Sequence, residues 1–250
     1  MMTLKEAIMV RFSVIVPMYN LGEYLQPMLD TLANQTENFE LWLISDGSTD
    51  ETFAHAQQFV RGIANWHAIE IAHSGISAAR NTGLKHATGD LIGFVDGDDR
   101  LAPDFVQMLQ AGFSQPNIMA TAVGYRWWGV NQHHLPGWVL FDQQQMFGQV
   151  TQHGSAVGGY VWNKAFRRAA IGDLRFDESL HIAEDYWFTA NFVAQNPGTY
   201  AFEPNVRYVK VARPNSTIHT ADRRQEAQVF NRIHDLAKHL DHGHNHDRYD

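Results

Sequence analysis

The chain has 250 residues, 44% of them hydrophobic, which is enough to bury a core as one large α/β domain or two small ones. With 19 Lys and Arg against 27 Asp and Glu, the formal net charge is −8 and no basic run appears, so we expect no nucleic-acid partner and no anionic membrane as the main partner. Cysteine is absent, which excludes disulfides, thiolate nucleophiles and Cys-based zinc sites.

The amino-terminal segment does not have the features of a signal peptide. Lys5 and Glu6 interrupt it, and it lacks both a long apolar core and a small-residue cleavage site. No stretch of the sequence approaches the roughly 20 apolar residues of a membrane-spanning helix. We therefore expect a cytoplasmic protein, whose contact with a membrane would be peripheral, at the inner face.

From Phe12 onward, short β-rich runs alternate with amphipathic helical patterns. The predicted strands cover 12–17, 41–44, 67–72 and 91–95, and the predicted helices cover 21–34, 50–61, 77–87 and 103–113. Repeated strand–helix steps predict an α/β fold with a doubly wound, mostly parallel central sheet. The runs SVIV, LWLI and LIGFV are nearly all apolar, as expected of strands that helices cover on both faces.

After Asn117 the rhythm changes to longer β-like and irregular segments rich in Trp, Tyr, Gly and His, which predict a smaller mixed region. The expected elements are β-like runs over 118–130 and 137–141, a helix that begins near Glu184 and ends before Pro197, one or two strands over 199–211, and a helix over 221–240. We expect a single domain over 11–219, with a first half (11–116) and a second half (117–219). A C-terminal helix and a loose His-rich tail would follow over 220–250.

The predicted parallel strands end in polar residues, in the sequences PMYN, SDGS, HSG and DGDD. In open parallel sheets, ligands bind beyond the carboxyl ends of the strands. We therefore expect these segments to line one crevice. Asp46, at the end of the second strand, could accept hydrogens from a base or a ribose hydroxyl, whereas Ser48 to Glu51 have the spacing of a helix capping box. Tyr19 could stack on a base or belong to the core.

The segment FVDGDDR places Asp96, Asp98 and Asp99 within four positions behind an apolar strand. Ionised carboxylates this close repel one another by about 1 kcal/mol per pair unless a cation compensates or a pKa rises. A solvated turn is the plain alternative, but hard oxygen ligands at a strand end favour Mg²⁺ or Mn²⁺ that also binds a diphosphate. An EF-hand is disfavoured because its twelfth position would be Gln107 rather than Glu.

In the segment GISAARNTG, a flexible Gly75 precedes Ser77, a candidate N-cap, and Arg80 in the first helical turns. Helix amides and a guanidinium form an anion site. Alternatively, Arg80 could pair with Asp96 or Asp98 and neutralise the carboxylates, and the two interpretations are compatible. Neither a G-x-G-x-x-G motif, a Walker A motif nor a nucleophile elbow occurs, which disfavours dinucleotide, P-loop and acyl-transfer chemistry.

With VIVPMYN, ISDGSTDET, GISAARNTGLKHATGDLIGFVDGDD, VWNKAFRR and EDYWF in that order, the chain resembles the family 2 glycosyltransferases of the GT-A fold from about Phe12 to Ser216. The resemblance implies an inverting enzyme that depends on Mn²⁺ or Mg²⁺ and takes a nucleotide diphosphate sugar, most often a UDP-sugar. Processive members add a Q-x-x-R-W motif after the base. Here Arg126-Trp127 precedes the candidate base and Val123 replaces the Gln, so we expect a non-processive enzyme.

The resemblance also implies that residues 11–116 form the nucleotide-sugar-binding half and residues 117–219 the acceptor-binding half. It implies roles for single residues as well. Pro17, Tyr19 and Asp46 would frame the uridine, Arg80 would approach the diphosphate, Asp96 would meet the ribose or the metal's waters, and Asp98 would be the main metal ligand. Glu184 and Asp185 match the family's Glu-Asp pair, with Asp185 as the general base. Acidic residues that favour a helix N-terminus are the structural alternative for this pair. Ser45, where relatives often carry Asp, leaves the contacts to base and ribose open.

The sequence therefore favours transfer of one sugar to an acceptor hydroxyl in polysaccharide or glycoconjugate biosynthesis. The acceptor would be a saccharide, a lipid-linked saccharide or another glycoconjugate. One of Trp127 and Trp128 could stack on a sugar, and Trp138, Trp162 and Trp187 are expected in the core. Lys164 lies either near the substrates or at the surface.

A sugar nucleotidyltransferase is the alternative function, although the segment PMYNLG lacks the basic residues of such an enzyme. A non-catalytic nucleotide-sugar-binding protein would not need Asp185. The sequence leaves open whether the chain forms a homodimer.

Overall fold

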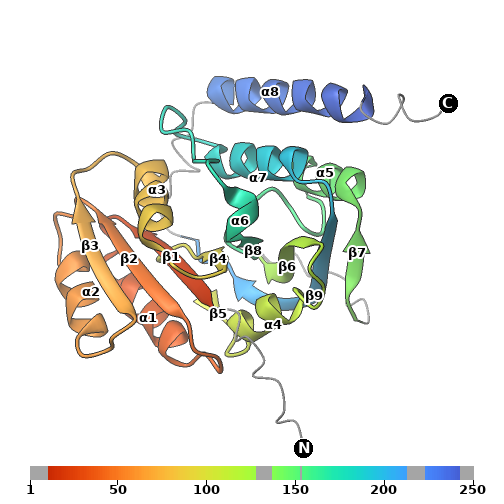
Figure 1. Ribbon diagram of the computed structural model, residues 1–250. Coiled ribbons are helices and arrows are strands. Elements are labelled where there is room, and N and C mark those ends of the chain that lie inside the picture. The colour runs from red at the N-terminus through yellow and green to blue at the C-terminus, as the bar shows by residue number, and fades with distance from the viewer. Residues whose placement is uncertain (1–10, 128–136, 153, 213–222, 243–250) are drawn as a thin grey trace, which may run out of the picture.

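The computed structural model describes residues 11–127, 137–152, 154–212 and 223–242. These residues form a nine-stranded sheet in the order β3-β2-β1-β4-β8-β6-β9-β5, with β7 paired to β9 (Figure 1). The strands are β1 (Phe12–Met18), β2 (Glu40–Asp46), β3 (Trp66–Ile71), β4 (Leu91–Phe94), β5 (Arg100–Leu101), β6 (Ile118–Arg126), β7 (Val139–Phe141), β8 (Lys164–Arg167) and β9 (Thr199–Val209).

The helices cover both faces of this sheet (Figure 1). They are η1 (Gly22–Tyr24), α1 (Leu25–Ala33), α2 (Thr52–Val60), α3 (Ile76–His86), α4 (Phe105–Ala111), α5 (Gln143–Thr151), α6 (Arg168–Ile171), α7 (Glu184–Gln195) and α8 (Arg223–His242). Within the described ranges, no helix is both long enough and apolar enough to span a bilayer.

The first half of the sheet is parallel and the second half is mixed. β1 pairs in parallel with β2 and with β4, and β2 pairs in parallel with β3. β8 is antiparallel to both β4 and β6, which joins the two halves into one sheet, and β6 runs parallel to β9. The predicted α/β architecture, with a smaller mixed region, is confirmed.

Alternation along the strands divides the core between the two faces. Ile15, Ile92 and Phe94 pack in one cluster, with residues of α5, α7 and α8. Val14 and Val16 pack in the other cluster, with residues of α1 and α4. Because successive strand side chains point to opposite faces, the nearly continuous apolar runs of the sequence correspond to strands covered on both sides.

Several elements of the second half were not predicted from the sequence, whose pattern indicated irregular segments there. α5 begins after Asp142, whose side chain accepts a hydrogen bond from the Gln145 amide in a capping box. The motif VWNKAFRR contains β8. The short β5, which follows the carboxylate segment in the first half, was not predicted either. β6 ends at Arg126, and residues 128–130 of the predicted run lie outside the described ranges. The division of the domain at residue 116 stays a prediction.

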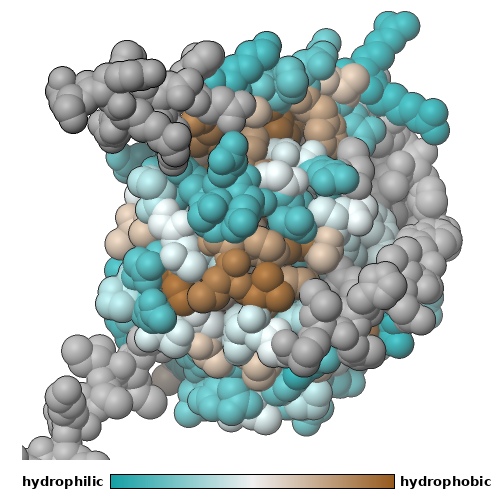
Figure 2. Space-filling model, turned by 90° about the vertical axis from the view of Figure 1, so that its right-hand side faces the viewer, coloured by the Kyte–Doolittle hydropathy of each residue, from teal (hydrophilic) through white to brown (hydrophobic). Residues whose placement is uncertain are grey.

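β7 lies at the outer edge of the second half, and its face of the molecule shows an apolar patch in Figure 2. Leu140, on β7, is 56% exposed, and Trp138, just before it, is 37% exposed. The expectation that Trp138 lies in the core is therefore wrong. Trp162 is buried, as expected, and Trp187 is partly buried beneath the guanidinium of Arg232.

Gly83 lets α3 lie directly on the sheet, which fixes the position of the whole helix. A Cβ atom at this residue would lie 2.3 Å from Cγ2 of Ile15 on β1. We expect Gly83→Ala to destabilise the fold by about 1–3 kcal/mol despite the better helix propensity of Ala, because the buried contact cannot relax. Chemical denaturation measures the change.

Gly148 provides the matched control, since it also lies in a helix, α5, but a Cβ atom added there would have no other atom within 4 Å. Gly148→Ala should leave stability unchanged or raise it by about 0.5–1 kcal/mol. Equal effects of the two substitutions would contradict the close contact between α3 and β1.

Candidate active site

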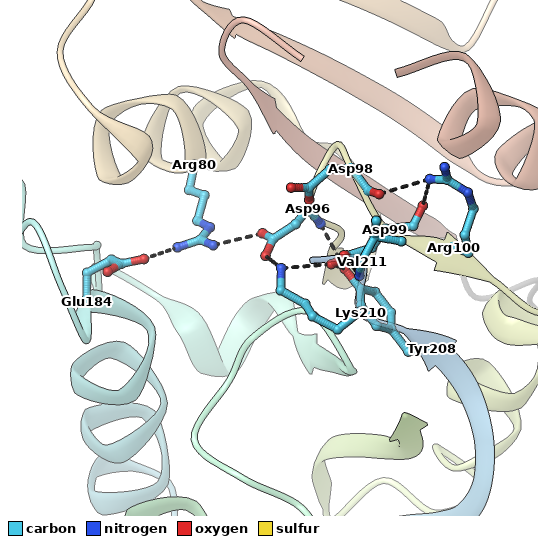
Figure 3. A network of polar contacts seen from close by, with 9 residues as sticks. All are labelled: Arg80, Asp96, Asp98, Asp99, Arg100, Glu184, Tyr208, Lys210 and Val211. Atoms are coloured by element: carbon cyan, nitrogen blue, oxygen red, sulfur yellow. Dashed lines mark hydrogen bonds and ion pairs between the residues drawn. The ribbon is translucent and has the colours of Figure 1, made fainter. Parts of the chain in front are cut away.

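The carboxylates that follow β4 in the chain lie in a turn, residues 96–99. Hydrogen bonds and an ion pair join this turn to the end of β9 (Figure 3). Asp99 is fully buried, and its Oδ2 accepts hydrogen bonds from the Tyr208 hydroxyl at 2.5 Å and from Lys210 Nζ at 2.9 Å. Its Oδ1 accepts from the Val211 amide at 2.8 Å. Burial raises the pKa of Asp99 to about 7 although Lys210 opposes the rise. Asp99 thus shapes the turn.

Arg80 joins this turn to α7. Its Nη1 lies 2.7 Å from Glu184 Oε1, and its Nη2 lies 3.1 Å from Asp96 Oδ1. The Arg80 side chain is 2% exposed, so water and salt weaken these two ion pairs only slightly. The sequence left open whether Arg80 meets a diphosphate or a carboxylate, and the structure shows that it pairs with Asp96.

Asp96 lies between two cations, since Lys210 Nζ is 2.7 Å from its Oδ2. Burial alone would raise the pKa of Asp96, but Lys210 and Arg80 outweigh burial and lower it to about 2. Glu184, Arg80, Asp96, Lys210 and Asp99 therefore form a continuous chain of ion pairs, which we call the ion network (Figure 3). It connects α7, α3, the turn behind β4 and the end of β9.

Negative charge exceeds positive charge around this network. The carboxylates of Asp96, Asp98, Asp99, Glu184 and Asp185 outnumber the nearby cations, which are Arg80, Lys210 and Arg100. Arg100 donates hydrogen bonds to the backbone carbonyl oxygens of Asp98 and Asp99. Protonation at the raised pKa of Asp99 relieves part of the excess. A bound cation would relieve it further, so the site has the electrostatic character of a cation-binding centre.

Asp185 follows Glu184 in the first turn of α7 and has an unusual protonation equilibrium. Burial raises the pKa of its carboxyl to about 7, Glu184 adds to the rise and Arg80 opposes it. A carboxylate with a pKa near neutrality accepts a proton more readily than an ordinary aspartate does. Ala183, directly before this pair, has a left-handed backbone (φ 56°), which costs about 1 kcal/mol in a residue with a Cβ atom. Strain of this kind is concentrated at functional sites.

The other polar strand ends gather beside the start of α3. Tyr19 is 42% exposed and stacks on His73, with ring centroids 4.3 Å apart. Asp46 is buried, and its carboxylate accepts hydrogen bonds from the amides of Ser74 at 2.7 Å and Gly75 at 2.9 Å. Asp46 thereby orders the loop that leads into α3, and Tyr19 with His73 presents an aromatic surface. Pro17 is buried within β1.

A family model matches the part of the chain that carries Tyr19, Asp46, Arg80 and the carboxylate turn. The model described as Glycosyl transferase family 2 matches residues 13–175. The chain belongs to glycosyl transferase family 2. The site geometry is consistent with this family, because residues of its motifs in the first half come together at one edge of the sheet with the Glu-Asp pair of α7.

Curated relatives of the family cover most of the chain. EpsJ of Bacillus subtilis (strain 168), an uncharacterized glycosyltransferase, is 30% identical over 213 residues, which are 82% of this chain and 62% of EpsJ. YibD of Escherichia coli (strain K12), also an uncharacterized glycosyltransferase, is 35% identical over 190 residues, 72% of this chain and 55% of YibD. The chain thus spans less than two thirds of the length of either relative.

Solved structures share the fold. TarS 1-349 of S. aureus in complex with UDP-GlcNAc has a TM-score of 0.67 and 26% identity, covering 85% of this chain and 61% of TarS 1-349. The mannosyltransferase PcManGT from Pyrobaculum calidifontis in complex with GDP-Man and Mn²⁺ has a TM-score of 0.65 and 19% identity, covering 89% of this chain and 62% of PcManGT. At that identity the second likeness shows the fold alone. The predicted GT-A fold is confirmed.

The side chains of the candidate site supply only part of the ligand set that a divalent metal needs. Within the described ranges, no three His, Cys, Asp or Glu side chains are arranged to hold a metal ion. Asp98, at the edge of the turn, offers a hard oxygen ligand in a region of excess negative charge, whereas Asp99 is fully enclosed by β9. This donor set fits Mg²⁺ or Mn²⁺ that takes its other ligands from water and a diphosphate.

The residues that β9 brings to the site were not predicted from the sequence. Tyr208 and Lys210 come from the end of β9, more than 100 positions after the turn that they bind. The only signal in the sequence is a Lys that directly follows the β-like run ending in RYV. Lys164 is fully buried, so the alternative that places it at the surface is wrong.

The raised pKa of Asp185 predicts a stability that depends on pH. Because the folded protein holds this proton up to about pH 7 and the unfolded chain only to about pH 4, the folded state binds more protons between these values and its stability falls as pH rises. Asp185→Asn cannot ionise and keeps an oxygen for the Tyr186 amide, which donates to Asp185 Oδ1. Its unfolding midpoint should exceed that of the wild type by several degrees at pH 8 and approach it at pH 4.

Glu23→Gln is the control for this comparison, since Glu23 is an exposed carboxylate and the substitution also removes one charge. Thermal denaturation of the three proteins across this pH range measures the effect. If Asp185→Asn and Glu23→Gln follow the same profile, Asp185 ionises as an ordinary aspartate.

Proposed function

We propose that this chain is a metal-dependent, inverting and non-processive glycosyltransferase. It moves one sugar from a nucleotide diphosphate sugar, a UDP-sugar, to an acceptor hydroxyl in the biosynthesis of a polysaccharide or glycoconjugate. The observation that carries the proposal is the pairing of Arg80 with both Asp96 and Glu184, which sets the carboxylate turn beside the neighbouring Asp185. The UDP-GlcNAc complex of TarS, at 26% identity, supports a UDP-sugar as the donor.

In the proposed mechanism, Asp185 is the general base. Its carboxylate takes the proton of the acceptor hydroxyl while that oxygen attacks the anomeric carbon of the donor sugar. The bond between the anomeric carbon and the diphosphate oxygen breaks on the opposite face, and the diphosphate leaves with the electron pair. Because a single displacement inverts the anomeric centre, one carboxylate base is enough and no covalent intermediate is required.

The residues of the turn divide the work of donor binding. Asp98, with water and donor oxygens, would hold Mn²⁺ or Mg²⁺, which neutralises the charge that develops on the diphosphate. Asp96, held by Arg80 and Lys210, would face the ribose or the waters of the metal. Arg80 contributes to the donor site by fixing Asp96, and Tyr19 with His73 would stack on the uracil while Asp46 holds the adjacent loop.

Binding of the donor tests this function directly. A panel of UDP- and GDP-sugars, each with and without Mn²⁺, is compared by thermal shift and by slow hydrolysis of the donor. We expect a UDP-sugar to raise the unfolding temperature, and the rise to require the metal. If no nucleotide sugar stabilises the protein in a metal-dependent way, the proposed function is wrong.

Two substitutions separate the base from the metal ligand. Asp185→Asn should keep the donor Kd within about threefold and reduce kcat for transfer by roughly 10²–10⁴, the contribution of a positioned base. Asp98→Asn should weaken metal-dependent donor binding, so that Mn²⁺ no longer enables the UDP-sugar to raise the unfolding temperature. Calorimetry measures binding, and turnover is measured with the donor identified by the panel. Full turnover in Asp185→Asn would remove Asp185 from this role.

A further inference from the structure

A stack of aromatic rings runs from the carboxylate turn toward the base. Tyr208, which bonds Asp99, stacks on Trp162 with centroids 4.6 Å apart, and Trp162 stacks on Tyr160 at 4.7 Å. Tyr160 meets Tyr186, the neighbour of Asp185, edge to face at 5.1 Å. The stack therefore joins the two ends of the ion network, and Tyr160 contacts the chain neighbour of Asp185.

The accessible end of this stack consists of Tyr160 and Trp127. Both side chains are partly exposed, whereas Tyr208, Trp162 and Tyr186 are buried. The Trp127 and Tyr160 rings lie 5.5 Å apart, edge to face. Burial raises the pKa of Tyr160 to about 12, with Asp185 adding to the rise and Lys210 opposing it, so the phenol is within electrostatic range of both ends of the site. We call Tyr160 and Trp127 the aromatic wall.

A buried ammonium group fixes the backbone that carries this wall. Lys164 Nζ donates hydrogen bonds to the carbonyl oxygens of Tyr160 at 2.6 Å, Gly158 at 2.7 Å and Val157 at 3.1 Å, and lies 2.8 Å from Asn163 Oδ1. Gly158 adopts a positive φ of 67°, and a Cβ atom there would lie 2.8 Å from the Tyr160 ring. The ring is thus held in place before any ligand binds, which lowers the entropic cost of binding.

The cations near the wall are already engaged. Arg80 and Lys210 bind carboxylates, and Lys164 binds carbonyl oxygens. Arg126 is exposed but neighbours Trp127 along the chain, and alternation on an extended strand directs the two side chains to opposite sides. Among the described residues, the wall therefore offers aromatic carbon and nearby carboxylate oxygens, a combination that attracts an uncharged sugar ring with hydroxyl donors and repels phosphate.

We propose that Tyr160 and Trp127 form the acceptor subsite and that the acceptor is an uncharged pyranose residue at the end of a saccharide. This inference rests on the proposed function. The apolar CH face of the ring packs on the aromatic wall, and one hydroxyl is directed toward Asp185. That hydroxyl oxygen bonds to the anomeric carbon of the donor, its proton passes to Asp185, and the diphosphate leaves with the electrons of the broken bond. TarS, by contrast, is named for a poly(ribitol-phosphate) acceptor.

Saturation-transfer NMR tests the wall with methyl β-glucopyranoside, methyl β-galactopyranoside and methyl β-N-acetylglucosaminide, against ribitol phosphate, all in the presence of UDP and diamagnetic Mg²⁺. We expect at least one pyranoside to bind and Trp127→Ala to weaken its Kd at least tenfold. The Kd of UDP should change less than twofold. Trp138→Ala, which removes a Trp that is 37% exposed just before β7, is the matched control and should leave both Kd values unchanged.

A measurement on the unmutated protein covers the case in which Trp127→Ala does not fold. The protein is labelled with 5-fluorotryptophan, and the signals of Trp127 and Trp138 are assigned from their Phe variants. Addition of the pyranoside should shift the Trp127 signal and leave the Trp138 signal in place. Two results would overturn the acceptor assignment: ribitol phosphate binds and none of the pyranosides does, or a pyranoside binds without shifting the Trp127 signal. In either case, continued binding of UDP would leave the proposed function intact. Loss of UDP binding in the wild type would instead reject the proposed function itself.

Discussion

The guanidinium of Arg80 holds together two parts of the molecule that lie far apart in the sequence. It is 2% exposed and lies between Asp96, behind β4, and Glu184, at the start of α7. A buried charge of this kind is tolerated only when its partners are in place, and removal of one partner typically costs about 3–5 kcal/mol. The spacing between the carboxylate turn and the base is therefore set by one side chain from α3, and α3 is set in turn by the close contact of Gly83 with Ile15.

Ion pairing and burial together divide the carboxylates of the site by protonation state. Asp96, between two cations, has a pKa of about 2, whereas burial raises the pKa of Asp99 and of Asp185 to about 7. Asp96 is thus permanently charged, and Asp185 can exchange a proton near neutral pH. Lys210 contributes on the donor side, because its ion pairs are with Asp96 and Asp99 of the turn. The ion network therefore keeps Asp96 charged, whereas burial beside the network makes Asp185 a proton acceptor, although both residues are aspartates.

The sequence predicted which polar strand ends lie together, whereas the roles of the site residues stay predictions. Carboxyl ends of parallel strands meet at one edge, so the clustering of Asp96, Asp46 and Tyr19 near α3 followed from strand order alone. Lys210 and Tyr208 could not be found in this way, because their place depends on β9 pairing with β5, as in the Arg100 and Val209 register, which is a long-range property of the sheet. Lys164 was misjudged because Lys is rarely fully buried, and only the tertiary fold supplies the carbonyl oxygens that bind it.

The continuous sheet joins the second half of the chain directly to this centre. β8 pairs with β4 on one side and with β6 on the other. β4, which leads into the carboxylate turn, and β6, which leads to Trp127, therefore belong to one continuous sheet. The distance between turn and base then does not depend on a hinge between two domains. Tyr160 and Trp127 project from a loop and a strand end, which tolerate substitution more readily than the buried ion network does. A change of acceptor would therefore require new side chains at the aromatic wall but no change in Arg80, Asp96 or Asp185.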